Sequence, residues 1–543
     1  MNAGTLLAVT LATPLAMLLA CVSPQLRDRM PALLAFAPLP ALIAALLAPS
    51  GSSLVMPPGL LGMTLVLDTP GAMLLGVAAL LWIAAGAYAG ADLRGRPTGG
   101  RFAVWWLMTL TGNIGVFMAA DLQSFYLFFT LVSLAAYGLI VHDDTPASRR
   151  AAAVTLALAV LGEAFLLMGF VLLAAAAPGG SLLISDAVAA LPTSPWRDSA
   201  LTLLILGFGL KIGLVPLHVW MPLAYSAAPT SAAAVLSGAA VKAGVIGLIR
   251  FLPLETALPG WGEALVAAGL FSAFYGVAIG LTQANPRTVL AYSSVSQMGL
   301  LAAVLGMGLA TGDPTVRIAA AFYAVHHVLA KGGLFLAVGV VALTRSRSLW
   351  PVLLPATIVA LGLAGLPLTG GALAKLAVKG PLGDGIVGML VMLSAIASTI
   401  LMLHFVRRLL PIASQPSRVA APGGLVLPWL AIALASVVVP WTLYPEIANA
   451  SWRDALAPNV LWEAVGPVLI GAVMAYRLRR WEYLLPRIPE GDLLETAKIA
   501  ARATGNLSAA MEQIDGYLRQ WPVAGVLLLG LTIILAGTML AGR

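Results

Sequence analysis

Long apolar blocks recur along almost the whole chain, and they constrain the fold more than any other feature. Each block holds about 20 residues, rich in Leu, Ala and Gly, and about 20 such residues cross the hydrocarbon core as one helix. The blocks lie at residues 3–22, 30–48, 71–91, 103–119, 122–141, 150–177, 200–219, 229–252, 262–282, 287–308, 316–343, 353–378, 385–406, 425–443, 458–476 and 521–541. The pattern predicts roughly 14 to 16 transmembrane helices.

The composition excludes other fold classes. Strands of a membrane β-barrel alternate polar and apolar residues, and these blocks do not. Only 10% of the residues are charged, against about 25% in soluble proteins. We therefore expect an all-α polytopic membrane protein. Its formal net charge of +8 fits the Lys/Arg bias of cytoplasmic loops and needs no nucleic-acid partner.

The loops predict an orientation. Arginines gather in the loops that follow odd-numbered blocks, and acidic residues gather in the loops that follow even-numbered blocks. Arginine-rich loops face the cytoplasm. The N-terminus is therefore expected outside, in a bacterial-type inner (cytoplasmic) membrane.

The single cysteine, Cys21, limits the chemistry that this chain can carry. It cannot form an internal disulfide or supply the several thiolates of an iron–sulfur cluster or structural zinc site. We expect no cofactor, no metal site and no catalytic residue. Any redox centre would lie on another subunit.

Lysine and arginine are segregated. Four lysines, Lys211, Lys242, Lys331 and Lys375, fall inside apolar blocks, whereas the arginines lie at block ends or in loops. A desolvated lysine can lose its proton, but arginine effectively cannot. The four lysines are therefore candidates for a proton relay.

Three more buried groups extend this relay. Glu163 is the one acid centred in a long block, and an antiparallel neighbour could bring Lys211 to its depth, as a functional pair or as a structural ion pair between helices. His326 and His327 share a block with Lys331, and His327 and Lys331 lie four residues apart on one helical face. Histidine suits proton transfer, although either ring could instead hydrogen-bond a backbone carbonyl.

Two blocks are interrupted at their centres by proline and glycine beside a lysine. Pro216 follows Lys211, and Pro367 precedes Lys375. Proline removes a backbone donor, so each helix is expected to break there. Matched broken helices in two halves of a chain indicate the ion path of a transporter.

Two polar segments leave alternatives open. Tyr292, Ser293, Ser296 and Gln297 could hold water between the lysines or link neighbouring helices. Residues 489–520 are polar with apolar residues at helical spacing. This amphipathic segment could lie on the membrane surface, on a neighbouring subunit, or simply lead into the last span.

The chain resembles the antiporter-like (proton-conducting) membrane subunits of respiratory complex I, Mrp sodium/proton antiporters and energy-converting membrane-bound hydrogenases. The likeness runs over about residues 105–404. Its motifs are Pro216-Leu-His-Val-Trp-Met-Pro222, Ala228-Pro-Thr, Val235-Leu-Ser-Gly-Ala-Ala-Val-Lys242-Ala-Gly, Leu290-Ala-Tyr-Ser-Ser-Val-Ser-Gln-Met-Gly299, His326-His-Val-Leu-Ala-Lys331 and Leu363-Ala-Gly-Leu-Pro367.

The resemblance implies two inverted five-helix repeats, each with a broken helix, and a chain of charged groups along the membrane midplane. Lys211 and Lys375 match the lysines of the two broken helices, Lys242 a Lys/His position, and His326 to Lys331 the central relay. The expected divisions are N-terminal helices at 1–102, repeats at 103–252 and 262–409, C-terminal helices at 410–488, the amphipathic segment at 489–520 and a last helix at 521–543.

This chain departs from the family pattern at two places. The family usually has a glutamate where this chain has Thr130, within Phe128-Phe-Thr130, and Glu163 is hypothesised to replace it as partner of Lys211. The usual acid and histidine after the Trp-x-Pro motif are Leu223 and Tyr225. These changes mark a divergent branch.

The predicted function is that of a non-catalytic, proton-translocating subunit in a complex I-like redox-driven pump. Its partners would be other membrane subunits, a peripheral redox arm and the lipid bilayer. An Mrp-type sodium/proton antiporter subunit and a proton-driven membrane partner of an inorganic-carbon uptake complex are the alternatives.

Overall fold

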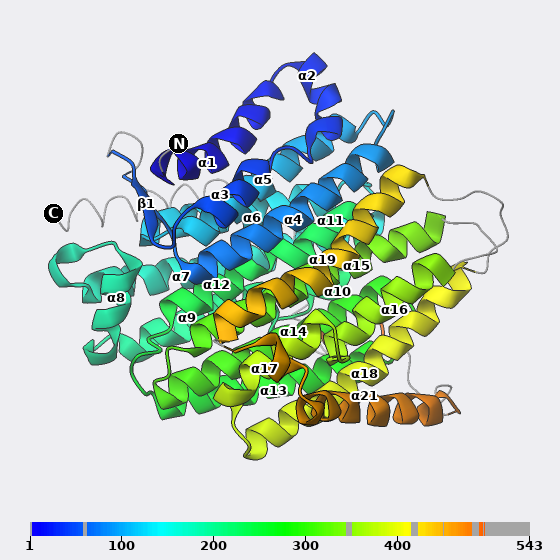
Figure 1. The fold of residues 1–543 in the computed structure, drawn as a ribbon. Helices are drawn as coiled ribbons and strands as arrows, with labels where there is room; N and C mark the ends of the chain where they lie inside the picture. The colour runs from blue at the N-terminus through cyan, green and yellow to red at the C-terminus, as the bar shows by residue number, and fades with distance from the viewer. Residues whose placement is uncertain are drawn as a thin grey trace, which may run out of the picture.

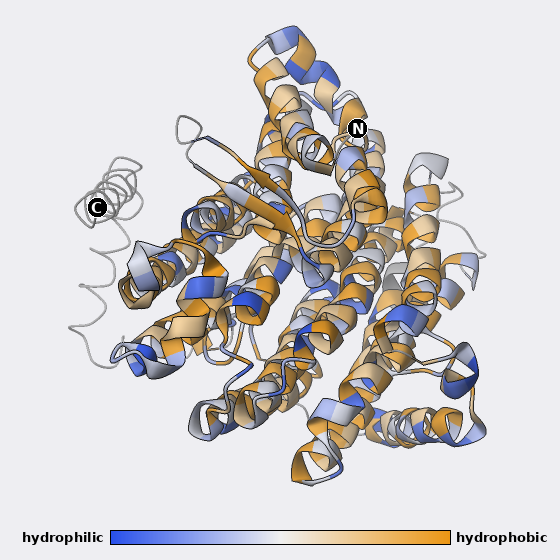
Figure 2. Cartoon of the chain, turned by 60° about the vertical axis from the view of Figure 1, so that its left-hand side comes forward, coloured by the Kyte–Doolittle hydropathy of each residue, from blue (hydrophilic) through white to orange (hydrophobic). Residues whose placement is uncertain are grey.

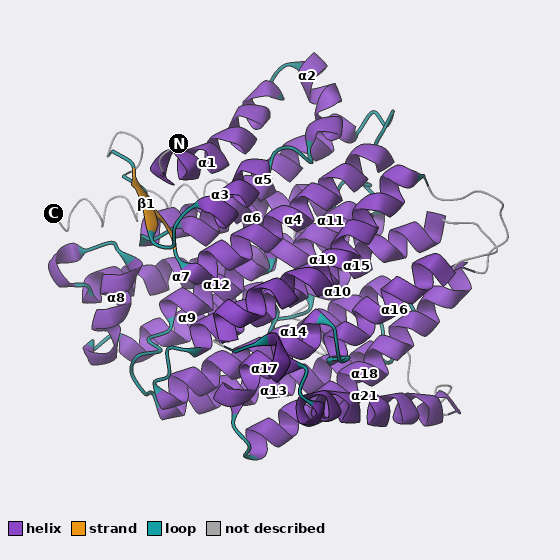
Figure 3. Cartoon of the chain, viewed as in Figure 1, coloured by secondary structure: helices purple, strands orange, loops and turns teal. Residues whose placement is uncertain are grey.

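The computed structural model describes residues 3–57, 62–343, 350–413, 422–448, 450–480, 488–491 and 493–494. Over these ranges the chain is almost entirely helical, and its strands form one short antiparallel hairpin (Figure 1, Figure 3). The predicted all-α membrane class is confirmed.

The N-terminal part precedes the first broken helix and contains the hairpin. Its elements are α1 (Ala3–Ala20), α2 (Pro24–Arg29), η1 (Met30–Leu33), α3 (Leu39–Leu47), β1 (Ser52–Val55), β2 (Thr64–Leu67), α4 (Thr69–Asp92) and α5 (Gly99–Met118).

The first half of the helix bundle follows. Its elements are α6 (Leu122–Ile140), α7 (Pro146–Ala176), η3 (Pro178–Gly180), α8 (Ile184–Ala190), η4 (Leu191–Thr193), α9 (Arg197–Ile212), α10 (Trp220–Ala227), α11 (Thr230–Val235), the π-helical turn η5 (Leu236–Ala240) and α12 (Lys242–Phe251).

The second half and the C-terminal helices complete the described chain. Their elements are α13 (Pro259–Gly280), α14 (Pro286–Thr311), α15 (Val316–Leu343), α16 (Trp350–Ala364), α17 (Gly370–Leu382), α18 (Ile386–Ala413), α19 (Gly423–Ala448), α20 (Trp452–Ala455) and α21 (Pro458–Leu478).

Eleven of the described helices are long and apolar enough to cross a membrane. Figure 2 shows that most residues along the helices are hydrophobic. The block at 30–48 does not form one continuous spanning helix, because it divides into η1 and the nine-residue α3. Nine helical residues extend about 14 Å, roughly half of the hydrocarbon core. The last apolar block, 521–541, lies outside the described residues.

Capping residues set where several helices begin. The Asp68 and Asp121 carboxylates accept hydrogen bonds from backbone amides in the first turns of α4 and α6. Thr145 forms a reciprocal capping box with Ser148 at the start of α7. Such caps satisfy amides that a helix leaves unpaired at its N-terminus.

Glycines allow α13 and α14 to pack closely. A Cβ atom at Gly269 would lie 2.5 Å from the Gly299 carbonyl oxygen, and one at Gly276 would lie 2.6 Å from the Tyr292 carbonyl oxygen. Small residues let membrane helices approach until their backbones touch. This seam fixes the rotation of α14, which carries the predicted polar patch.

We call the end of the bundle that carries the β1–β2 strands the hairpin end. There Arg250, at the end of α12, pairs with Asp68 at 2.7 Å and donates to the Val116, Phe117 and Ala119 carbonyls at the end of α5. One guanidinium thus joins α4, α5 and α12, and its fixed fork of donors suits this role.

Replacing Arg250 with alanine is expected to destabilise the protein by about 3 kcal/mol, because the Asp68 carboxylate and the three carbonyls lose the guanidinium donors. Thermal unfolding of the purified protein in detergent measures this change as a lower Tm. The matched control is Arg197→Ala, because Arg197 pairs with Asp198 in an exposed position. A Tm unchanged by Arg250→Ala would contradict the prediction.

The described start of the predicted amphipathic segment contacts the chain's own helices. The Glu490 carboxylate accepts hydrogen bonds from Ser226 (3.0 Å) after the first break, and from Thr288 (2.5 Å) and Asn285 (3.3 Å) at the start of α14. Glu490 therefore joins the two halves at the end of the bundle opposite the hairpin. Beyond residue 494, the segment lies outside the described residues.

Candidate ion-translocation site

Lys242 and His327 meet where the two halves of the bundle pack together. Lys242 begins α12, and His327 lies in α15; both side chains are 0% exposed. The lysine Nζ lies 2.5 Å from His327 Nδ1 and 3.4 Å from the Ser237 carbonyl oxygen. Because an ammonium has donors only, a charged Lys242 requires an unprotonated Nδ1. The pair can therefore share one proton between the halves.

Lys331 continues this contact along α15. Its Nζ donates a 2.9 Å hydrogen bond to the Leu290 carbonyl oxygen of α14, and the side chain is fully buried. His327 and Lys331 share a face of α15, as their spacing predicted. They do not bond to each other in the structure, because each has a partner on a neighbouring helix.

His326 faces a different part of the protein from His327. Its Nδ1 lies 3.4 Å from the Ser436 carbonyl oxygen of α19, whereas Nε2 has no hydrogen-bond partner among the described residues. Glycines Gly362 and Gly371, on either side of the second helix break, adjoin the ring. The sequence left open that one of the two histidines binds a backbone carbonyl instead of transferring protons, and His326 makes such a contact. Its Nε2 is directed toward the second break.

Lys375 lies at this second break. Helix α16 ends at Ala364, and α17 begins at Gly370. Lys375 Nζ donates to the Ala364 carbonyl oxygen, which the interrupted helix leaves available. Gly365 has a φ of +100° and its missing side chain leaves room for the lysine stem. The break expected at Pro367 is therefore present, and the carbonyl group of Ala364 at this break binds Lys375.

The first break resembles the second, because it also combines a lysine, a glycine with positive φ and a proline. Helix α9 ends at Ile212, one residue after Lys211, and Gly213 adopts a left-handed φ of +72°. The chain turns through Pro216 before α10 begins at Trp220, whose Nε1 donates to the Leu210 carbonyl oxygen at 2.9 Å. The tryptophan of the Trp-x-Pro motif thus caps the broken helix.

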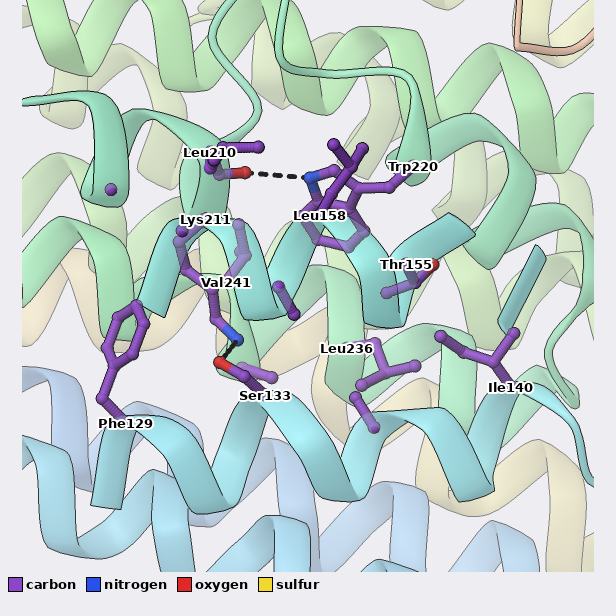
Figure 4. A pocket seen from close by; sticks show the side chains of 15 residues that line it. Phe129, Ser133, Ile140, Thr155, Leu158, Leu210, Lys211, Trp220, Leu236 and Val241 are labelled. Carbon is purple, nitrogen blue, oxygen red and sulfur yellow. Dashed lines mark hydrogen bonds between the residues drawn. The ribbon is translucent and has the colours of Figure 1, made fainter. Parts of the chain in front are cut away.

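Lys211 lines a cavity of about 40 Å³ between α6, α7, α9 and η5. Figure 4 shows the side chains around it, with Lys211 directed toward Ser133. Its Nζ donates to Ser133 Oγ at 2.8 Å and lies 5.3 Å from the centre of the Phe129 ring. The cavity continues from Lys211 to Ile140 and Thr155. This volume exceeds the roughly 15 Å³ that one water needs, so the lysine adjoins space for water.

Glu163 lies close to Lys211, and the hydroxyls of Thr130 and Ser133 face its carboxylate. Neither carboxylate oxygen has a hydrogen-bond partner within the described structure, and Thr130 Oγ1 has none either. Gly162 and Gly207 let α7 and α9 approach at this level. The structure therefore brings Glu163 to Lys211 and opposite the position where the family usually has a glutamate.

In the polar patch of α14, Gln297 links neighbouring helices, which is one of the two roles expected for the patch. Tyr323 donates to Gln297, and Gln297 Nε2 donates to Ser398 Oγ at 3.2 Å, so this side chain links α14 to α15 and α18. Ser296 Oγ is buried without a partner in the described structure, and Ser293 is also buried. The Tyr292 ring lies 6.0 Å from the His218 ring.

Sequence reasoning missed several residues of the site. The sequence does not single out Ser133, which binds Lys211, because serines are common in membrane helices. Asn113, buried in α5, carried a detectable signal, since an amide inside an apolar block needs partners. Tyr225, one of the family departures, donates to the Leu236 carbonyl oxygen at 3.4 Å. Among the described residues, no group of three or more His, Cys, Asp or Glu residues could hold a metal ion.

The fold and these buried groups define a class: polytopic helical membrane proteins with lysines at two helix breaks. A family model described as NADH:quinone oxidoreductase/Mrp antiporter, TM, matches residues 119–401, more than half of the chain. The chain belongs to this family of antiporter-like membrane subunits.

Curated relatives come from several complexes. Hydrogenase-4 component B of Escherichia coli is 30% identical, with 51% of this chain and 43% of the relative covered. NADH-quinone oxidoreductase subunit N of Desulforudis audaxviator is 33% identical, with 51% and 56% covered. Na(+)/H(+) antiporter subunit A1 of Staphylococcus haemolyticus is 31% identical, with 51% and 37% covered. The chain spans about half the length of these relatives.

Solved structures share the fold. A chain of the Mrp complex from Dietzia sp. has a TM-score of 0.75 at 23% identity, with 100% of this chain and 63% of that chain covered. A chain of the membrane-bound sulfane sulfur reductase, an archaeal respiratory membrane complex, has a TM-score of 0.69 at 20% identity, with 87% and 99% covered. Both neighbours are parts of multi-subunit membrane complexes.

Proposed function

We propose that this chain is a proton-translocating subunit of a complex I-like, redox-driven membrane complex. Protons would move along Glu163, Lys211, Lys242, His327, Lys331, His326 and Lys375. The observation that carries this proposal is the buried contact of Lys242 with His327, because it brings two groups that can exchange a proton together at the interface between the halves.

The groups at either end support a path through both halves. Lys211 lies at the first break beside the cavity, with Glu163 near it, and His326 and Lys375 lie at the second break. A charge change at one site alters its neighbour's affinity for a proton, which couples successive transfers. The buried Glu163 carboxylate and His326 Nε2 can accept or pass protons through inserted water.

The partners in this proposal are other membrane subunits and a peripheral redox arm, within a bacterial-type inner membrane and with the N-terminus outside. The named relatives from hydrogenase-4 and NADH-quinone oxidoreductase favour a redox-driven parent complex. The boundaries expected for the two repeats, 103–252 and 262–409, each enclose one broken helix. Copurification through a tag on this chain identifies the parent complex.

A sodium/proton antiporter subunit is the second candidate, favoured by the relative named as an Na(+)/H(+) antiporter subunit. Sodium prefers oxygen ligands. Glu163 is the one buried carboxylate within the interior of a described spanning helix. We therefore rank sodium exchange below proton translocation.

Replacing sodium with choline is expected to leave the proton flux unchanged. The complex purified through this chain would be reconstituted into proteoliposomes, and an imposed potassium diffusion potential would drive flux, read by an entrapped pH-sensitive dye. Flux abolished without sodium would favour the antiporter, and flux no greater than that of empty liposomes would refute the proposed function.

A further inference from the structure

A π-helical turn immediately precedes Lys242. Residues Leu236–Ala240 form this turn, η5, between α11 and α12. A π-turn breaks the regular α-helical hydrogen-bond ladder and often occurs at functional sites. Three carbonyls of the turn accept side-chain hydrogen bonds: Leu236 from the Tyr225 hydroxyl at 3.4 Å, Ser237 from Lys242 Nζ at 3.4 Å, and Ala239 from Asn113 Nδ2 at 3.3 Å.

The Asn113 amide is oriented by Trp82. The indole Nε1 of Trp82 donates a 2.9 Å hydrogen bond to Asn113 Oδ1. Because an indole nitrogen is a donor only, it selects the amide oxygen and directs the NH₂ group to the Ala239 carbonyl. Both side chains are almost completely buried, where a lost hydrogen bond is not replaced by bulk water.

The residue before Trp82 supports the same turn sterically. Leu81 of α4 fits against Gly238 of the turn and Gly332 of α15, and a Cβ atom at either glycine would overlap its side chain. Gly332 directly follows Lys331. The turn is therefore held between α4 and α15, with Asn113 of α5 bonded to its carbonyl.

We propose that Trp82 and Asn113 are positioning residues for Lys242, acting through the π-helical turn to hold its Nζ against His327. The inference rests on the proposed function. Among the described residues, His327 and Lys331, both from α15, are titratable groups that interact with Lys242. Trp82 and Asn113 both precede residue 119, where the family match begins. Trp82 belongs to the N-terminal helices expected at 1–102, so these helices contribute to the geometry of the relay.

Trp82→Phe tests this proposal because the chain contains a matched control. Trp106 forms an edge-to-face pair with Trp82 at 4.7 Å and is equally buried, but its Nε1 has no hydrogen-bond partner in the described structure. Trp82→Phe and Trp106→Phe thus remove the same atoms, and only the first removes a hydrogen bond to Asn113.

Proton flux into proteoliposomes, measured across pH, is the readout. We expect Trp82→Phe and Asn113→Leu to lower the flux about fivefold and to shift its pH midpoint by about half a unit, as the loss of one buried hydrogen bond implies. Trp106→Phe should leave the midpoint in place. An unchanged midpoint in Trp82→Phe, or an equal shift in Trp106→Phe, would overturn the proposal.

The double variant Trp82→Phe/Asn113→Leu tests whether Trp82 acts on Lys242 through Asn113 or independently of it. If Trp82 acts through Asn113, the double variant should match Asn113→Leu alone, whereas additive shifts would refute this order. Lys242→Ala, measured in parallel, separates the two proposals. Full flux in Lys242→Ala rejects the relay itself; lost flux there with an unchanged Trp82→Phe rejects only the positioning role.

Discussion

Replacing Lys242 with alanine is expected to lower proton flux through the assembled complex by about 100-fold, the lower range for loss of a positioned proton-transfer group. Lys242 contacts His327 at 2.5 Å across the boundary between the two halves. Alanine leaves the histidine without this partner and interrupts the path at its centre. The measurement is dye-reported proton flux in proteoliposomes.

Two further variants separate proton transfer from charge and from general damage. Lys242→Arg keeps a positive charge but cannot release it, so flux should stay low. Lys379→Ala removes a lysine that is exposed and paired with Glu463 at 2.7 Å, and flux should be normal. Near-normal flux in Lys242→Ala, with the complex intact, would reject the relay.

Glu163→Gln is expected to lower flux about tenfold or more, because the amide cannot exchange a proton with Lys211. The carboxylate is buried beside Lys211 with no hydrogen-bond partner for either oxygen in the described structure. Glutamine nearly preserves its shape, so assembly should persist. Proton flux and the yield of intact complex are measured on the same preparation.

The position of Thr130 provides a rescue experiment. Its hydroxyl faces Glu163, and it occupies the place where related subunits usually carry glutamate. Adding Thr130→Glu to Glu163→Gln moves the carboxylate from α7 to α6 beside the same lysine, and flux should recover. Full flux in Glu163→Gln alone, or no recovery in the double variant, would contradict the hypothesis that Glu163 replaces the glutamate that related subunits usually have at the position of Thr130.

These predictions differ in how far the sequence anticipated them. The sequence indicates that Lys211 and Glu163 could lie at a similar depth, because each lies centrally in consecutive apolar blocks, and the structure places them close to each other. The Lys242 to His327 contact joins residues 85 positions apart. No local pattern specifies which face of α12 meets which face of α15, so this pairing depended on helix packing.

The partners of the two adjacent histidines also depended on helix packing. His326 and His327 are indistinguishable in composition and depth along the chain, but successive helical residues point about 100° apart. His327 therefore faces Lys242, whereas His326 faces α19 and the second break. The sequence predicted that one histidine could contact a carbonyl, and only the neighbouring helices decided which.

By itself, the sequence determined the membrane class, the two helix breaks and the identity of the buried charged residues. These follow from local rules: the length of an apolar block, the missing donor of proline and the cost of desolvating a charge. The tertiary structure decided the partners of each lysine, the π-helical turn before Lys242 and the short helix α3 within an apolar block. Those features depend on the rotation and close approach of helices far apart in sequence, which only packing establishes.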